Sequence, residues 1–372
     1  MPPGELFELD LPDHLIFPGL VNAHEHLQLN AIPPLPPHAP FPNSYEWIAA
    51  YASHRSDPAV SAAAGVDRDL RHRHGALKNL LSGVTTVLHH DPWRESLGEP
   101  DFPVRVVRDL RWSHSLGLAM AAEAMAASAY GPPVLESFAA TLPGEPWFIH
   151  LAEGTDEVAA RELARLDALG CLTPATVLVH GVGLSAADVA RVIECGAALV
   201  WCPSSNLAIL GRTLDPRRLF DAGRLALGTD SRLSGARDVL AELKVAAAHS
   251  DLCAGELLRL VTSDAARVLR LAQAGGLSPG QWADLLILRD QGGDPASQLL
   301  RADRGQLRAV VRAGVPRIAD PDFAGWFAAG GLPALRARLD GGEKLLAREC
   351  LGSTGRAAAR MEPGLELADD HE

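Results

Sequence analysis

The sequence predicts an α/β protein, a (β/α)₈ barrel with a small, reduced β subdomain. Short apolar runs alternate with amphipathic stretches along most of the 372 residues, which is typical of parallel strands joined by helices. Residues that bind metals or move protons follow these runs at the carboxyl ends, where a barrel places its functional groups. After about residue 270 a turn cluster and two further apolar runs replace this alternation, and they predict the β subdomain.

Seven runs are apolar enough to be buried strands, namely residues 15–22, 84–89, 104–110, 147–151, 176–180, 198–201 and 224–228. The helical stretches between them include residues 60–81, 156–169, 186–195 and 236–248. We expect an eighth strand between residues 116 and 142. A doubly wound sheet would show the same alternation, but no glycine-rich phosphate loop opens a helix here, so the barrel is favoured.

The chain divides into three expected parts. Residues 14–270 form the barrel, and residues 1–13 together with 271–320 form the reduced β subdomain, with strands at 283–288 and 307–315. Residues 321–372 are expected to be C-terminal helices and a loose tail.

Composition excludes several classes of function. A formal charge of −12 and a pI near 5.6 argue against a general nucleic-acid binder. No apolar run reaches the roughly 18 residues that span a bilayer, and no signal peptide is recognisable, so we expect a cytoplasmic protein. The five cysteines are scattered and form no CxxC pair, which argues against a disulfide framework and against a thiolate zinc site.

The most informative feature is an apolar run that stops at His24-Glu25-His26. Residues i and i+2 of a strand point to the same side, so the two imidazoles can converge on one ion. Neutral imidazole is a preferred ligand of zinc and of other divalent transition metals. A catalytic metal takes three or four such ligands and keeps a position open. His150 and Asp230, each at the end of a different strand, are the further candidates.

Two more residues are candidates for proton transfer. Glu153 lies three residues beyond His150, where the chain leaves its strand, and a carboxylate near an activated water can pass the water's proton to a leaving group. A carboxylate that interacts with the dipole of a helix N-terminus is the alternative for Glu153. His180 closes the next strand and would hydrogen-bond the attacking hydroxide or the developing oxyanion, with packing behind the site as its alternative.

In order and spacing these segments resemble the amidohydrolase superfamily, in the branch of the cytosine, guanine and adenosine-derivative deaminases and the triazine hydrolases. The matching segments are residues 18–26 (PGLVNAHEH), 82–87 (SGVTTV), 150–153 (HLAE), 179–181 (VHG), 201–207 (WCPSSNL), 227–231 (LGTDS) and 276–285 (GLSPGQWADL). About 14 residues precede the first barrel strand where the family usually has about 50.

The resemblance implies a distorted TIM barrel and one divalent metal ion, zinc or alternatively iron. By it, Glu153 is a proton shuttle, His180 is the partner of the attacking hydroxide, and Asp230 also activates the water. The metal ligands it implies are His24, His26, His150 and Asp230. Binuclear relatives bridge their metals with a carboxylated lysine, but no lysine of this chain occupies a mid-barrel strand, which favours one metal. The three lysines are Lys78, Lys244 and Lys344.

The expected reaction is attack of metal-bound hydroxide on an sp² carbon that bears nitrogen, so that a nucleobase-like heterocycle is deaminated. Hydrolysis of a cyclic amide at the same site is an alternative, as is a non-catalytic barrel used as a binding or scaffold protein. An isomerase or a decarboxylase on the same barrel is a third. The partner is then a small-molecule substrate, with no nucleic acid and no membrane, and a homo-oligomer is left open.

Substrate contacts are expected from polar and aromatic residues near the strand ends and in the loop after the first strand. The candidates are Tyr45, Trp47, His89, His90, Arg111 and His114. For the loop, a hydrophobic staple with a helix N-cap at Asn43 or Ser44 explains the residues equally well. Arg232 is expected either to meet an anionic substrate group or to form a surface salt bridge. The residues expected to brace the barrel rim are Ser204, Ser205 and Asn206.

Overall fold

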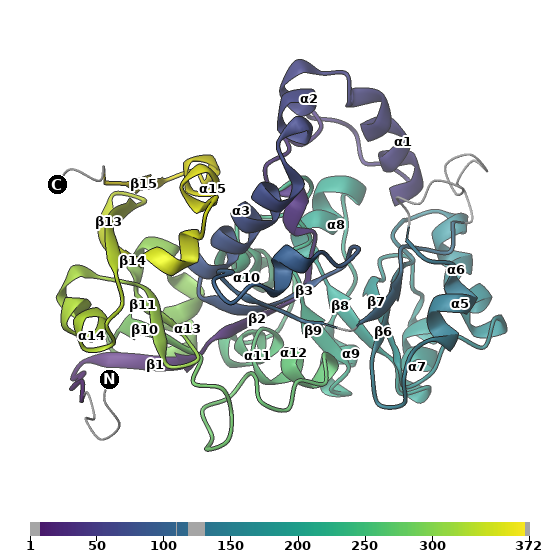
Figure 1. Cartoon of the computed structure of the whole chain (residues 1–372). Coiled ribbons are helices and arrows are strands. Elements are labelled where there is room, and N and C mark those ends of the chain that lie inside the picture. The colour runs from purple at the N-terminus through teal and green to yellow at the C-terminus, as the bar shows by residue number, and fades with distance from the viewer. Residues whose placement is uncertain (1–7, 109, 118–130, 369–372) are drawn as a thin grey trace.

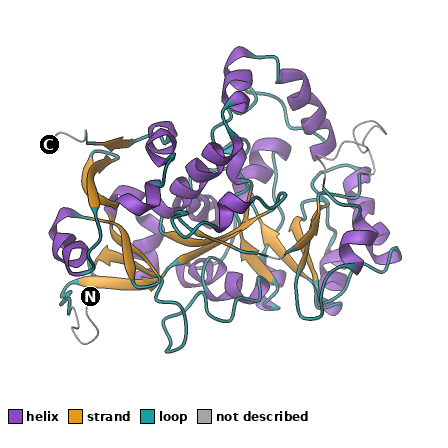
Figure 2. Cartoon of the chain, in the orientation of Figure 1, coloured by secondary structure: helices purple, strands orange, loops and turns teal. Residues whose placement is uncertain are grey.

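The computed structural model describes residues 8–108, 110–117 and 131–368. In Figure 1 an antiparallel sheet lies at the left, and parallel strands lie in the centre and at the right. Figure 2 shows helices around the parallel strands, with α1 and α2 projecting above them. The helices are α1 (Ser44–His54), α2 (Pro58–Gly65), α3 (Arg68–Leu81), α5 (Val134–Ala139), α6 (Glu157–Ala168), α7 (Ala186–Glu194), α8 (Pro203–Leu210), α9 (Arg217–Asp221), α10 (Val239–Ala248), α11 (Ala254–Leu260), α12 (Ser263–Val268), α13 (Pro295–Arg301), α14 (Ala324–Ala329) and α15 (Gly355–Met361).

The parallel strands are β2 (Leu20–Glu25), β3 (Val84–His89), β4 (Arg105–Val106), β5 (Arg111–Ser113), β6 (Trp147–Leu151), β7 (Thr176–His180), β8 (Ala198–Trp201) and β9 (Leu225–Leu227). They form two sheets, ordered β2-β3-β4 and β5-β6-β7-β8-β9. Every residue of β2, β3, β6 and β7 is buried, because helices or neighbouring strands cover both faces, and such strands appear in the sequence as unbroken apolar runs. The predicted bounds of β3, β6, β7 and β8 are confirmed.

The described strands do not close into one hydrogen-bonded barrel, which corrects part of the sequence prediction. At one seam β2 meets the end of β9 through an isolated parallel bridge between Glu25 and Asp230. At the other seam β4 and β5 belong to different sheets, yet only residues 107–110 separate them, too few for a crossover helix. Of the run predicted as one strand at 104–110, the described residues form only β4, and the edge strand of the other sheet, β5, begins beyond that run at Arg111. Of the span expected to hold an eighth strand, residues 118–130 lie outside the described residues, and the described remainder holds α5.

The first predicted strand is divided at Gly19. Residues before it form β1 (His14–Pro18), which pairs antiparallel with β10 (Leu285–Arg289), whereas residues after it pair in parallel with β3. Pro18 has no N–H for a ladder, and a Cβ on Gly19 would lie 2.4 Å from Thr85 Oγ1. The chain switches sheets at this point, and the switch joins the antiparallel sheet directly to the strand that carries His24.

The antiparallel sheet has the order β1-β10-β11-β12-β14-β13-β15 and extends further toward the C-terminus than expected. Its other strands are β11 (Leu307–Arg312), β12 (Val315–Ala319), β13 (Ala334–Leu339), β14 (Gly342–Ala347) and β15 (Leu365–Leu367). The prediction of helices and a loose tail after residue 321 is wrong for these last three strands. The burial of β13 alternates residue by residue, and Asp340-Gly341 adopts positive φ at the turn, which is the signature of a β-hairpin.

Acidic and hydroxyl side chains begin several of the helices that surround the parallel strands. Asp67 caps α3 by accepting from the backbone N–H groups of Asp69 and Leu70, each at 3.0 Å. Asp156 and Asp238 cap α6 and α10 in the same way. These helices therefore start where the sequence supplies an acceptor for their unpaired N–H groups.

The C-terminal helix α15 is joined through Glu362 to α3, one of the helices around the parallel strands. Glu362 is 2% exposed. Its carboxylate accepts from His74 Nε2 of α3 at 3.0 Å and from Arg232 Nη1 and Nη2 at 2.8 and 2.7 Å, and it also accepts from Arg304. Burial alone would raise the pKa of Glu362, but the bonds from His74 and Arg232 outweigh it and hold that pKa well below 4.5.

We expect Glu362→Gln to lower the free energy of unfolding at pH 7 by about 3 kcal/mol or more, since it leaves buried guanidinium groups without their counter-charge. A carboxyl group whose folded pKa is depressed stabilises above its unfolded pKa and loses that contribution as the pH falls. The difference between wild type and variant in urea titrations should therefore shrink below about pH 4.5. Glu366→Gln on exposed β15 is the control, and a pH-independent difference would contradict this account.

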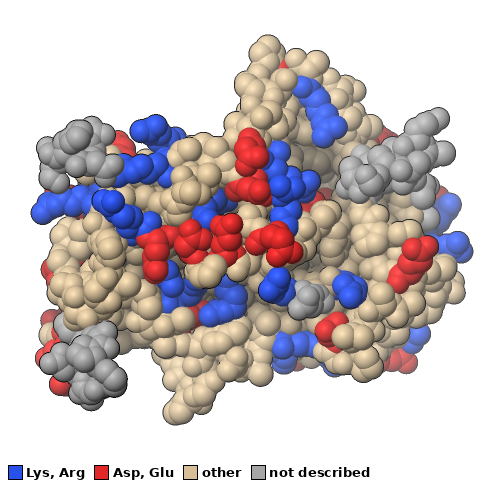
Figure 3. Space-filling view, viewed as in Figure 1, with Lys and Arg blue, Asp and Glu red and all other residues tan. Residues whose placement is uncertain are grey.

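Charged side chains of both signs lie on the face seen in Figure 3, where a row of acidic groups crosses the centre with basic groups above and below it. On this face the basic groups do not form a continuous stripe. Within the described ranges, none of the helices has the length and apolar character required to pass through a membrane.

Candidate metal centre

His24 and His26 lie at the carboxyl end of β2, and both are buried. Glu25, between them, bonds to a different set of residues, because neighbouring side chains of an extended chain point to opposite sides. Its Oε2 accepts from Lys78 Nζ at 2.7 Å and from Asn79 Nδ2 at 3.0 Å, both on α3. Glu25 and Lys78 are fully buried, so this ion pair fixes the position of the strand end beneath the two histidines.

The same buried network ties the strand end to the segment after β9. Thr229 donates its hydroxyl to Glu25 Oε2 at 3.0 Å, and its backbone N–H bonds to Asn22 Oδ1 at 3.1 Å. A Cβ on Gly228 would lie 2.6 Å from His24 Cβ, so only glycine lets the two segments approach. Asp230, the next residue but one, is brought against the histidines by this contact.

Four predicted ligands come together from three strand ends. His150 Nε2, on β6, lies 3.3 Å from both His24 Nε2 and His26 Nε2. Asp230 Oδ1 lies 3.8 Å from His24 Nε2 and 3.7 Å from His26 Nε2. Two groups of donor atoms each fall within 4.8 Å of one another, one formed by His24, His26 and Asp230 and one by His24, His150 and His180. The structure therefore brings the four predicted ligands together.

Hydrogen bonds on the far side of the rings assign the tautomers of His26 and His150. His26 Nδ1 lies 2.6 Å from Asp91 Oδ2, and His150 Nδ1 lies 2.8 Å from the carbonyl oxygen of His114. Since a carboxylate and a carbonyl only accept, each Nδ1 carries a proton, and each Nε2 has a free lone pair when its ring is neutral. Burial alone would lower the pKa of His26, but Asp91 raises it to about 9, which makes this ring a more basic ligand.

Two successive hydrogen bonds, through His90, assign the tautomer of His24 in the same way. His90 Nε2 lies 3.2 Å from the carbonyl oxygen of Ser113 and must donate to it. Burial lowers the pKa of His90 well below 6.5, so the ring is neutral and its Nδ1 is an acceptor. His24 Nδ1, at 3.4 Å, therefore donates to His90, and His24 Nε2 is left as a lone pair as well.

The converging Nε2 atoms of His24, His26 and His150 are thus all acceptors when the three rings are neutral. His150 Nε2 lies 3.3 Å from each of the other two, so either a proton on His26 or a cation among the three atoms is needed to offset the repulsion between their lone pairs. Burial lowers the pKa values of His24 and His150 well below 6.5, so these rings are in the neutral form that binds a metal. Three imidazoles and one carboxylate match the donor set that divalent zinc or iron prefers.

We expect His90→Phe to weaken zinc binding about 10- to 100-fold, because the ring keeps its packing against Trp112 but no longer accepts from His24 Nδ1. Competition with a chromophoric chelator measures this affinity. His72→Phe is the matched control, since His72 is a buried histidine whose ring nitrogens make no hydrogen bond. Equal zinc affinities for His90→Phe and wild type would contradict this role of His90.

Glu153 and His180 meet beside the ligands. Glu153 Oε1 lies 3.6 Å from His180 Nε2, and the Glu153 side chain is 12% exposed. Burial raises the pKa of Glu153 above its ordinary value, which favours the protonated form that a general acid needs. His180 Nδ1 lies 2.9 Å from Asn206 Oδ1 and donates to it, so His180 Nε2 is also an acceptor. Ala152, His180 and Asp230 all have positive φ, a strained conformation that occurs often at functional sites.

The residues expected to brace the rim do so through these same groups. Ser205 Oγ donates to Asp230 Oδ2 at 2.6 Å, and Ser234 Oγ donates to the same oxygen at 2.7 Å. Asn206 holds His180, and Ser204 bonds to buried Glu242, whose pKa burial raises to about 7. With Oδ2 held in this way, only Oδ1 of Asp230 faces His24 and His26.

The substrate candidates in the loop after β2 have other contacts. Asn43 caps α1 by accepting from Glu46 N at 3.0 Å, which is the structural alternative given for this loop. Tyr45 is 8% exposed, and its hydroxyl donates to Glu162 of α6. Trp47 stacks on Tyr51 with ring centroids 5.6 Å apart. None of these observations places Tyr45 or Trp47 against a substrate, and the role of Trp47 stays a prediction.

The remaining substrate candidates separate into three kinds. His90 lies behind His24, and the ring of His114 is 4.8 Å from that of His150. His89 is buried and packs against His72, with centroids 5.1 Å apart. Arg111 is exposed at the amino end of β5, opposite the strand ends that carry the ligands, and donates to the Ala140 carbonyl. This placement argues against a substrate contact by Arg111.

Arg232 is not available to an anionic substrate group, and the alternative of a surface salt bridge is also wrong. Both of its terminal nitrogens bond to the buried carboxylate of Glu362. Sequence reasoning also missed Asp91 and Glu162, which orient His26 and the loop before Glu153. For Asp91 a signal was present, because it directly follows a strand that ends in two histidines.

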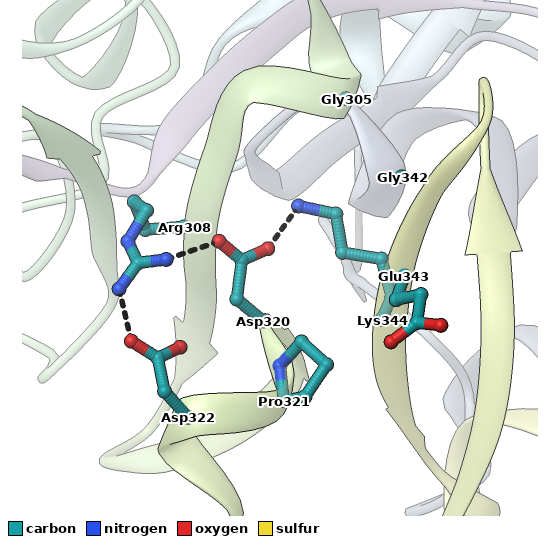
Figure 4. Close-up of a pocket in the computed structure, with 8 residues that line it drawn as sticks. All are labelled: Gly305, Arg308, Asp320, Pro321, Asp322, Gly342, Glu343 and Lys344. Atoms are coloured by element: carbon teal, nitrogen blue, oxygen red, sulfur yellow. Dashed lines mark hydrogen bonds and ion pairs between the residues drawn. The ribbon is translucent and has the colours of Figure 1, made fainter.

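A surface pocket elsewhere, shown in Figure 4, lies on the antiparallel sheet and is lined by charged residues. Asp320 accepts from Arg308 Nη1 and from Lys344 Nζ, each at 2.5 Å, and Arg308 also pairs with Asp322. These charges neutralise one another, so the pocket has no counterpart to the unpaired lone pairs of the metal centre.

Comparison with known proteins shows which proteins this chain is similar to. The chain is 33% identical over 181 residues to the 5-methylthioadenosine/S-adenosylhomocysteine deaminase of Teredinibacter turnerae, a match that covers 42% of this chain and only 41% of that protein. It is 26% identical over 360 residues to the deaminase of the same name from Nitratidesulfovibrio vulgaris (strain Hildenborough), covering 82% and 79%. An adenosine deaminase structure from Xanthomonas campestris with bound zinc aligns with a TM-score of 0.63 at 24% identity over 86% of this chain and 85% of that one, which shows a TIM-barrel-like α/β fold.

The model of the Amidohydrolase family matches residues 117–325, more than half of the chain. This match includes the site residues His150, Glu153, His180 and Asp230. It confirms the resemblance and the hydrolase class predicted from the sequence. The chain therefore belongs to the amidohydrolase family.

Proposed function

We propose that this chain is a metal-dependent hydrolase that deaminates a heterocyclic, nucleobase-like substrate on a distorted (β/α)₈ barrel. The observation that carries the proposal is the convergence of three imidazole lone pairs and one carboxylate oxygen next to Glu153 and His180. The curated relatives are named as deaminases of adenosine derivatives, and this supports a substrate in which an amine is attached to a heterocycle.

His24, His26, His150 and Asp230 would hold one divalent ion, most simply zinc. When bound, such an ion acts as a Lewis acid and lowers the pKa of water from 15.7 toward about 7. Lys78 does not provide a carboxylated lysine that could bridge two ions, because its ammonium group forms a buried ion pair with Glu25. This supports a single ion.

The side chains divide the proton transfers among them. Asp230 Oδ1 accepts a proton from the attacking water, and Glu153 donates one to the nitrogen side of the substrate. His180 Nε2, as an acceptor in the neutral ring, takes a hydrogen bond from the water and orients it, which is the first of the two roles expected from the sequence. The new bond joins the water oxygen to the ring carbon, the exocyclic C–N bond breaks, and ammonia leaves.

The test uses protein purified without chelator. We expect one divalent ion per chain by elemental mass spectrometry, and ammonia release from at least one member of a panel of aminopurines, aminopyrimidines and aminotriazines. A chelator should abolish this release and added zinc should restore it. Ring opening of hydantoin-like amides without ammonia release would replace deamination by the cyclic-amide alternative. A protein with neither metal nor turnover would be a binding or scaffold protein.

A further inference from the structure

The peptide before Glu153 is held in a conformation that L-amino acids rarely adopt. Ala152 has φ of +54° and no side chain that stabilises it. Its N–H donates to Glu162 Oε2 at 2.6 Å, and its carbonyl accepts from Gly183 N at 2.7 Å. Both polar groups of this residue are therefore fixed, and the direction in which the chain enters Glu153 is fixed with them.

The carboxyl group that holds Ala152 is itself held from another element. Glu162 lies on α6 and is 2% exposed, and the hydroxyl of Tyr45 on α1 donates to its other oxygen. Burial raises the pKa of Glu162 to about 7 against the opposing bonds from Tyr45 and Ala152. A leucine would fill this space without that cost, so the site retains a buried polar group where packing alone would not need one.

The segment before Tyr45 is bonded to the segment that carries Glu153. Ser44 N donates to the Glu153 carbonyl at 2.9 Å, and Thr155 N donates to the Pro42 carbonyl at 2.7 Å. Asn43 forms an isolated bridge with Gly154, so residues 42–45 and 152–155 make one hydrogen-bonded unit. Tyr45 belongs to this unit and therefore acts on the proton-transfer segment rather than on a substrate.

We propose that Tyr45 and Glu162 are positioning residues that hold the Ala152 peptide and so set the direction of the Glu153 carboxyl group. The inference rests on the proposed function, in which Glu153 transfers a proton. A carboxyl group displaced by about 1 Å still leaves substrate binding intact but slows the chemical step about 100-fold. The effect should therefore fall on kcat and not on KM.

Three substitutions remove different parts of the contact between Tyr45, Glu162 and Ala152, and their effects on kcat can be compared. Glu162→Leu removes both bonds and should lower kcat about 100-fold, with KM within about threefold of wild type and unchanged metal content. Glu162→Gln keeps an oxygen for Ala152 N–H, and Tyr45→Phe keeps the carboxylate, so both should stay within about tenfold. Tyr51→Phe is the control, since Tyr51 is on the same helix and its hydroxyl has no hydrogen-bond partner.

A second measurement places the effect on Glu153. In a Glu153→Gln background, adding Glu162→Leu should change the residual kcat by less than about twofold, because the group that it positions is already gone. A full 100-fold loss in that background would overturn the proposal, as would a wild-type kcat for Glu162→Leu. If instead Glu153→Gln alone is as fast as wild type, the proposed function of Glu153 fails first, and the positioning role fails with it.

Discussion

Alanine at His24 or at Asp230 is expected to remove bound metal and turnover together. His24 Nε2 lies 3.3 Å from His150 Nε2 and 3.8 Å from Asp230 Oδ1, so each residue is one of four donors around the same point. The loss of one donor leaves too few ligands for a stable site. We expect the metal content to fall from one ion per chain to nearly none, and kcat to fall about 1000-fold or more.

His249→Ala is the matched control, because His249 is an exposed histidine at the end of α10, away from the ligands. It should keep full metal content and activity. Elemental analysis and kcat are measured on the same preparations. Substantial activity in a His24→Ala protein that lacks metal would show that the reaction does not depend on this centre.

Glutamine at Glu153 is expected to keep the metal and to lower kcat by about 10²- to 10⁴-fold. The two side chains have the same shape, so the packing beside His180 persists, but an amide cannot deliver a proton to the departing nitrogen. Circular dichroism and elemental analysis should match wild type, which assigns the loss to chemistry. Steady-state kinetics on the best substrate of the panel measures it.

Glu157→Gln is the control for this substitution. Glu157 opens α6 four residues beyond Glu153, and its side chain is 84% exposed in an ion pair with Arg161. It should change kcat by less than about twofold, since exposed ion pairs of this kind contribute little. A Glu153→Gln variant that is as active as the Glu157→Gln variant would remove Glu153 from the mechanism.

The parts of the fold that the sequence predicts well are those in which one local pattern has one physical solution. The runs at 84–89, 147–151, 176–180 and 198–201 are strands with the predicted bounds, because a continuous apolar run of that length can be buried only between two covered faces. Leu335 and Leu339 had two solutions, since residues four apart share a face in both a helix and a strand. The Asp340-Gly341 turn decides between them in favour of a hairpin.

The prediction of a closed barrel failed for a different reason. The run at 104–110 looks like one strand, and nothing local reveals that only β4 forms within its described residues and that β5, which begins at Arg111, belongs to a different sheet. Closure depends on the register between distant strands, which is set by contacts far apart in the sequence. A pattern read along the chain does not contain that information.

The residues of the candidate centre likewise fall into those that the sequence predicted and those that it did not. His24, His26, His150 and Asp230 were predicted as ligands because each lies at or just beyond the carboxyl end of a strand, and parallel strands bring these ends together. The groups that orient them were not found, since His90 and Asp91 act on rings more than 60 residues away. The loop that contains Tyr45 shows the limit most clearly. An aromatic and polar loop near a site fits a lid and a structural contact equally well until the partner of its hydroxyl is known.

X-ray diffraction from crystals of the zinc-loaded protein, recorded on both sides of the zinc absorption edge, tests the central claim most directly. The account predicts one anomalous peak per chain, bounded by His24 Nε2, His26 Nε2, His150 Nε2 and Asp230 Oδ1, at about 2.0–2.2 Å from each. Two peaks there, or a single peak at another place with these four side chains turned apart, would contradict it.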